Sequence, residues 1–138
     1  MKNTTQELIN QIKQTDDIEK FLLEHKEDLL TETTHGLLNQ LLGEKNMKIA
    51  VVAERAGQGD YVYKVFGGKR KASRDILAAI AIGMKLDIAQ TQLLMRISGY
   101  SSLDPRVRRD SVIIYALEKG VDINTVNDIL YDLQENTL

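Results

Sequence analysis

Residues 48–74 read KIAVVAERAGQGDYVYKVFGGKRKASR, and this stretch decides the fold that we predict. Residues 49–56 are small and apolar enough to form a short helix that packs closely across another. Gly57 follows directly, and glycine allows the positive φ of a sharp turn after a helix. Residues 60–67 predict a second short helix whose apolar side chains point inward (Val62, Val65 and Phe66). Two short helices joined by a glycine-containing turn are typical of a helix-turn-helix.

Positive charge gathers on the same stretch of an otherwise acidic chain. Residues 44–74 hold eight Lys or Arg and three acids, a net charge of +5, whereas residues 1–43 carry −4 and residues 75–138 carry −3. The whole chain has a net charge of −2 and a pI near 5.7, which by itself argues against nucleic acid. Binding depends on the field of one face, however, so the basic segment indicates a nucleic-acid surface.

Helical periodicity covers nearly the whole chain, and we expect an all-α fold of seven to nine helices. Residues 4–30 predict an acidic pair, the second capped by Asp16 and carrying one apolar face (Ile18, Phe21, Leu22 and Leu29). A third helix is expected at about 33–45. Four later helices are expected to begin at capping positions: Ser73, Asp87, Asp104-Pro105 and Asp122. The last two would span 105–119 and 123–133.

One segment has two possible structures. Residues 61–66, YVYKVF, are rich in side chains that favour β-strands. The flanking helices and the lack of a partner strand favour a helix, and we predict one.

Composition limits the class of protein. The 138 residues are 43% apolar, enough to bury a core, and they include no cysteine, so disulfides and cysteine metal sites are excluded. The longest apolar run is far below the roughly 20 residues that span a bilayer. The polar N-terminal residues lack the apolar centre of a signal peptide. We expect a soluble cytoplasmic protein without a cofactor.

The motifs resemble a known family. The segments Glu44-Lys45-Asn46, Val52-Ala53-Glu54-Arg55-Ala56-Gly57 and Gly68-Lys69-Arg70-Lys71-Ala72-Ser73 together resemble the lambda-repressor-like helix-turn-helix, also called the xenobiotic-response-element (XRE) or Cro type. Three later segments look like a group of Firmicutes regulators of this type: residues 100–105, 109–114 and 127–131.

The resemblance implies a division of the chain. A lambda-repressor-like five-helix DNA-binding core would occupy residues 35–99, with its recognition helix at about 60–67. Residues 1–34 would form an N-terminal helical extension. Residues 100–138 would form a C-terminal helical extension packed on the same core.

Candidate DNA contacts follow from helix-turn-helix geometry, in which the second helix enters the major groove. Base readers would be the polar residues at and before that helix: Gln58, Asp60, Tyr61 and Lys64. Phosphate contacts would come from the basic loop and the next helix start: Lys69, Arg70, Lys71, Ser73 and Arg74. Lys48 joins them because the family usually carries a polar residue early in the first helix of the motif.

Two of these residues have alternative interpretations. Asp60 repels phosphates, so it is either the N-cap of the second helix, which we favour, or an acceptor from a cytosine amino group. Tyr61 either contacts DNA or is a half-buried tyrosine of the ordinary kind, and Tyr63 is a weaker candidate.

Other polar groups are interpreted as structural. His25 and His35 lack metal-ligand spacing, and the carboxylates of residues 16–28 fit a solvated helix face. Arg106, Arg108 and Arg109, next to Asp110, are expected to form intramolecular or interfacial ion pairs. Nothing resembles a nucleophile, a phosphate-binding loop or a metal site, so we expect no enzyme.

The sequence therefore predicts a DNA-binding transcriptional regulator that acts on double-stranded DNA. A homodimer is expected, because one short recognition helix offers few base contacts. The N-terminal or C-terminal helices could contact a protein partner. The alternative is a protein-interaction module on the same fold: an inhibitor, an antitoxin-like protein or a mobile-element protein. It is favoured by the acidic flanks and by polar residues of the family pattern that are missing here.

Overall fold

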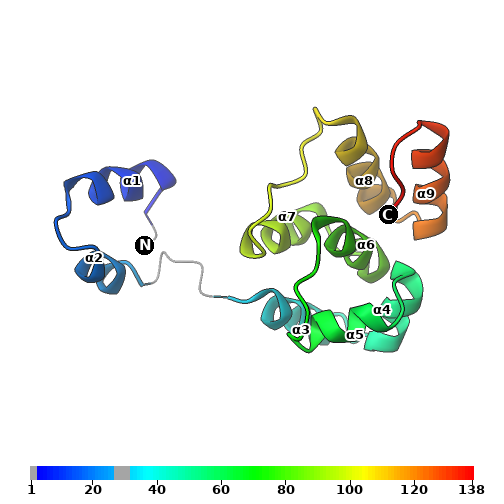
Figure 1. Cartoon of the computed structure of the whole chain (residues 1–138), viewed down its shortest axis with the longest axis horizontal. Coiled ribbons are helices and arrows are strands. Elements are labelled where there is room, and N and C mark those ends of the chain that lie inside the picture. The colour runs from blue at the N-terminus through cyan, green and yellow to red at the C-terminus, as the bar shows by residue number, and fades with distance from the viewer. Residues whose placement is uncertain (1–2, 27–31) are drawn as a thin grey trace. The chain divides into compact units, whose positions relative to one another are not determined.

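The computed structural model describes residues 3–26 and 32–138, and these contain nine helices and no strand (Figure 1). The all-α prediction is confirmed for this part of the chain, including a helix in place of the alternative strand at 61–66. The chain divides into two compact units, Met1–Thr31 and Glu32–Leu138. The predicted core and C-terminal extension both lie in the second unit.

The first unit holds α1 (Thr5–Gln14) and α2 (Ile18–Glu24). Asp17 caps α2 by accepting from the N–H of Lys20, so the prediction of Asp16 as cap was wrong by one residue. Phe21 is the buried hydrophobic residue among residues 3–26, and its ring lies 4.4 Å from that of His25. Other large apolar side chains of these two helices are exposed: Ile9, Ile12, Ile18, Leu22 and Leu23. Leu29, predicted on the same face, lies outside the described residues.

The second unit contains seven helices. They are α3 (Thr34–Glu44), α4 (Ile49–Ala56), α5 (Asp60–Phe66), α6 (Arg74–Met84), α7 (Ile88–Ile97), α8 (Arg108–Lys119) and α9 (Ile123–Asp132). Three predicted caps are confirmed, since Ser73, Asp87 and Asp122 each accept from the backbone N–H three residues on. Asp87 and Gln90 form a full capping box.

The start of α8 differs from the prediction, because Asp104-Pro105 does not open the helix. The Asp104 carboxylate accepts from the backbone and guanidinium of Arg106, and its own N–H donates to Asp110. These bonds fix a turn over residues 104–107, and α8 begins only at Arg108. The prediction of Asp104-Pro105 as the start of this helix was therefore wrong, because the two residues belong to the turn that precedes α8.

Helix α6 forms the centre of the second unit. Its residues from Leu77 to Met84 are all buried, and α4, α7, α8 and α9 pack against it (Figure 1). The closest approach is at Gly83, where an added Cβ would lie 3.1 Å from the backbone nitrogen of Ala56. Only glycine leaves room for α4 and α6 to cross at this separation.

The C-terminal helices belong to the same core. Ile113 and Ala116 of α8 and Val126 and Leu130 of α9 are all buried in one cluster with α3 to α7. The segment after residue 99 is therefore packed on the five preceding helices of its unit.

Replacing Gly83 with alanine should lower the free energy of unfolding by about 1–3 kcal/mol, because α4 and α6 would have to move apart. Urea unfolding followed by circular dichroism measures the change. Gly43→Ala is the matched control, because a Cβ there meets nothing within 4 Å. It should leave stability unchanged or raise it by up to about 1 kcal/mol. Equal effects of the two substitutions would show that the close crossing is not a constraint.

Candidate nucleic-acid interface

The turn between α4 and α5 is built from two glycines. Gly57 ends α4 with φ 69°, as predicted, and Gly59 precedes α5 with φ 56° and ψ −135°, a conformation open almost only to glycine. Asp60 is the first residue of α5, and the N-cap position belongs to Gly59 without a side-chain cap. The prediction of Asp60 as N-cap was therefore wrong. Its carboxylate lies at the positive end of the helix dipole instead.

Helix α5 has an inner and an outer face. Val62, Val65 and Phe66 are buried, as predicted. Asn39 of α3 donates to the carbonyl of Phe66 at 2.8 Å and so ties down the end of α5. On the outer side, the predicted base readers Asp60 and Lys64 are exposed, whereas Gln58 and Tyr61 are half-buried. Lys48 is also exposed, at the N-cap position of α4.

The basic loop, Lys69–Lys71, follows α5 and has a fixed backbone. The carbonyl of Lys64 accepts from the N–H groups of Lys69 and Arg70, at 2.9 and 3.3 Å. The hydroxyl of Tyr61 donates to the carbonyl of Lys71 at 2.9 Å, and that of Tyr100 donates to the carbonyl of Ala72 at 2.6 Å. All three basic side chains of the loop are exposed. The loop thus displays three consecutive cations from a held main chain.

Two tyrosines define how this loop is held. Tyr61, predicted as either a base reader or a half-buried tyrosine, packs partly against the core and uses its hydroxyl on the loop. Tyr100 was not singled out from the sequence as a site residue. Its ring centre lies 5.4 Å from the Nζ of Lys71, within the range of a cation–π contact.

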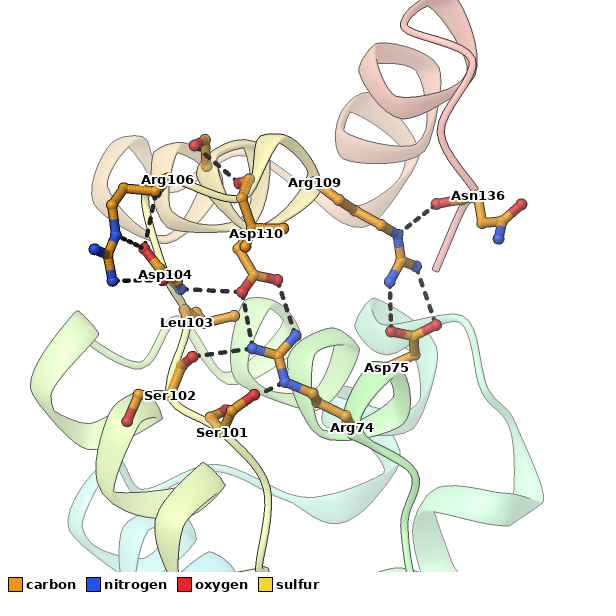
Figure 2. A network of polar contacts seen from close by, with 12 residues as sticks. Arg74, Asp75, Ser101, Ser102, Leu103, Asp104, Arg106, Arg109, Asp110 and Asn136 are labelled. Carbon is orange, nitrogen blue, oxygen red and sulfur yellow. Dashed lines mark hydrogen bonds and ion pairs between the residues drawn. The ribbon is translucent and has the colours of Figure 1, made fainter.

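The next two predicted contacts, Ser73 and Arg74, have different surroundings. Ser73 is exposed, and its Oγ accepts from the N–H of Ile76 as the cap of α6. Arg74 turns away from the loop toward α8, where both terminal nitrogens donate to the Asp110 carboxylate at 2.8 Å (Figure 2). Its guanidinium also donates to the carbonyls of Ser101 and Ser102. Four of its five N–H groups donate inside the protein, so Arg74 is left out of the phosphate contacts proposed below.

The neighbouring residue makes the reciprocal ion pair. Asp75 accepts two bonds from Arg109, at 2.7 and 3.0 Å (Figure 2). The Arg-Asp dipeptide at the start of α6 thus pairs with the Arg-Asp dipeptide at the start of α8. Arg109 also donates to the carbonyl of Asn136, which ties in the C-terminal segment.

The expectation of intramolecular contacts for the second basic cluster is confirmed. Arg109 pairs with Asp75, Arg106 pairs with Asp104 at the surface, and Arg108 donates to the carbonyl of Leu133. The partners of Arg108 and Arg109 were missed because they lie 25 and 34 residues away in sequence. The repeated Arg-Asp dipeptides, at 74–75 and 109–110, were the available signal.

The two ion pairs differ in burial. The Asp110 side chain is only 6% exposed and its partner Arg74 is 25% exposed. The hydrogen bonds from Arg74 hold the pKa of the Asp110 carboxyl below its usual 3.8, against the opposing effect of burial. The same contact raises the pKa of Arg74. The pair is a permanently charged link between α6 and α8 near neutral pH.

Two cavities lie on the second unit. One, of about 420 Å³, lies beside the basic loop and is lined by residues of that loop, the start of α3 and the end of α7. The other, of about 710 Å³, is lined by the ends of α4 and α6 and by the turn between α8 and α9. Within residues 3–26 and 32–138, no three His or acidic side chains cluster as metal ligands would. In the same residues, no helix is long and apolar enough to cross a membrane.

Comparison with known proteins gives no match, so functional inference rests on the geometry of the described residues. No family model, no curated protein and no solved structure matches this chain.

Replacing Asp110 with asparagine should lower the free energy of unfolding by about 3 kcal/mol, because Arg74 would keep a partly buried charge without its partner. Chemical denaturation at pH 7 measures the loss. Asp104→Asn is the matched control, since it breaks the exposed pair with Arg106, and its effect should be much smaller. Similar losses for the two variants would contradict a special role for Asp110.

The Asp110 pair should also shape the acid stability of the protein. Because the folded-state pKa of Asp110 lies below 3.8, the carboxyl contributes stability that is fully present above the unfolded-state pKa. That stability is lost as the pH falls through the lower, folded-state pKa. The free energy of unfolding, measured by chemical denaturation at several pH values between about 2 and 6, should fall less steeply with decreasing pH for Asp110→Asn than for the wild type. An unchanged pH dependence would contradict this assignment.

Proposed function

We propose that this protein is a DNA-binding regulator that uses α4 and α5 as a helix-turn-helix. The observation that carries the proposal is the basic loop. Three exposed cations follow α5 after two glycines, on a backbone held by hydrogen bonds to the Lys64 carbonyl and from the Tyr61 and Tyr100 hydroxyls. A loop of fixed cations beside an exposed helix face suits contacts to DNA phosphates, while the helix meets base edges.

The packing of the second unit supports a lambda-repressor-like arrangement. Helices α3 to α7 follow one another as five short helices, α5 packs on α3 and α4, and α4 crosses α6 closely. This order has α4 packed against both the short, partly exposed α5 and the buried α6. It agrees with the resemblance carried by the sequence motifs of residues 44–73.

The structure refines the residues proposed to contact DNA. Lys69, Arg70 and Lys71 would contact phosphates, together with the exposed residues Ser73 and Lys48. Asp60, Lys64 and the half-buried Gln58 would face the bases. Tyr61 acts mainly through the loop, because its hydroxyl holds the carbonyl of Lys71.

The small size of α5 favours a dimer on DNA. Of its seven residues, Val62, Val65 and Phe66 are buried, so few side chains remain for base contacts. Two copies bound to half-sites about one helical turn apart would double the contact set.

The triple variant Lys69→Ala, Arg70→Ala, Lys71→Ala tests the proposal. Wild-type binding to a random-sequence DNA duplex should weaken steeply as salt rises. Loss of three phosphate contacts should flatten the slope of log affinity against log salt by about 2 to 3, since each contributes about 0.9. Fluorescence anisotropy of a labelled duplex at several salt concentrations measures the slope.

A matched control removes three cations from the other unit. Lys13→Ala, Lys20→Ala, Lys26→Ala makes the same change in net charge, and these residues are also exposed. This control should keep the wild-type salt slope. Equal effects of the two triple variants would reject the basic loop as the contact surface. No binding at low salt would reject DNA binding and favour the protein-interaction alternative.

A further inference from the structure

His35 lies against the start of the basic loop. It belongs to the first turn of α3 and is exposed. A methyl group placed on Gly68 would lie 3.0 Å from both Cε1 and Nδ1 of this imidazole, so the ring faces the Cα of Gly68 directly. Gly68 also has φ 73°, which favours glycine. The imidazole therefore lies against Gly68, the residue that precedes Lys69 in the chain.

The cavity of about 420 Å³ brings His35 and the loop together. Three cations line it from one side (Lys69, Arg70 and Lys71), and His35 lines it from another. Hydroxyl-bearing residues complete its polar wall (Thr33, Thr34 and Ser98), and Val65 and Ile97 supply apolar surface. Cations, hydroxyls and an imidazole around one hollow are donors that suit a phosphate group.

We propose that this cavity binds one phosphate group and that His35 contacts it in the protonated form. The proposal rests on the proposed DNA binding for the identity of the ligand, a phosphodiester of the DNA backbone. Free phosphate has the same chemistry and is the alternative source. The inference adds α3 to a surface that the sequence assigned to residues 48–74 alone.

The charges around the cavity give the pH dependence its sign. Three cations (Lys69, Arg70 and Lys71) and one acid (Glu32) line the cavity together with His35, so its charge is net positive. A bound phosphate would favour the protonated imidazole. Binding then takes up a proton, so affinity rises as the pH falls through the range in which histidine titrates. The limit for one proton is about tenfold in affinity per pH unit.

The pH dependence of affinity can be assigned to one histidine, because His25 and His35 are the two histidines of the chain and they lie in different units. Affinity for a random-sequence duplex is measured at constant low salt from pH 8 to pH 6, for the wild type, His35→Gln and His25→Gln. We expect wild-type and His25→Gln affinity to rise about three- to tenfold over this range. His35→Gln should give a flat profile close to the wild-type value at pH 8.

A second variant and a second ligand separate the possible outcomes. His35→Lys carries a permanent charge, so it should bind with little pH dependence and more tightly than His35→Gln at pH 8. In parallel, the imidazole NMR signals of the wild type are followed while inorganic phosphate is added. Shifts of His35 with DNA and little change with phosphate identify the phosphodiester as ligand, and shifts with phosphate alone identify the free anion.

Failure of this inference can be told from failure of the proposed function. If the wild type binds DNA with a salt slope that depends on the basic loop, but His35→Gln keeps the wild-type pH profile, the role of His35 is wrong and DNA binding stands. If DNA does not bind, the proposed function fails, and the phosphate titration decides the cavity alone. If neither ligand shifts His35, the cavity does not bind phosphate.

Discussion

The second unit depends on the burial of α6. From Leu77 to Met84 every side chain of this helix is buried, so its neighbours must cover it on all sides. At one end this forces α4 into close contact with Gly83, which fixes the first helix of the motif. At the other end the helix begins with Arg74 and Asp75, two charges that lie at the edge of an apolar core. Asp110 and Arg109 of α8 pair with them there.

This pairing connects the C-terminal helices to the proposed DNA surface. Arg74 follows the basic loop in sequence, and an unpaired arginine there would extend the positive surface. Asp110 pairs with its guanidinium instead, and the carbonyls of Ser101 and Ser102 accept two more of its hydrogen bonds. Tyr100, just before those residues, holds the carbonyl of Ala72. The segment that leads into α8 therefore limits the cationic surface and fixes the end of the loop.

Local signals were predictable from sequence, and long-range partners were not. Gly57 as a left-handed helix end and Asp87 as a helix cap depend on residues a few positions apart, and both were predicted correctly. Arg74 pairs with a carboxylate 36 residues away in sequence. Hydrophobic periodicity does not specify such a long-range partner. Asp104-Pro105 failed for a related reason. The pattern of a helix start is present, but bonds to Arg106 and Asp110 stabilise a turn in its place.

The same reasoning bears on how the surface could read a sequence. The backbone of the loop is held at both ends, so its cations suit uniform contacts to phosphates. The face of α5 is smaller, because three of its seven residues are buried and Tyr61 is committed to the loop. Asp60 at its first position opposes phosphates, which leaves Lys64 as the exposed cation on the helix. In the proposed complex, a surface with fixed phosphate contacts and few base contacts would gain specificity chiefly by duplication, so selectivity among DNA sites would depend on a second copy more than on any one side chain of α5.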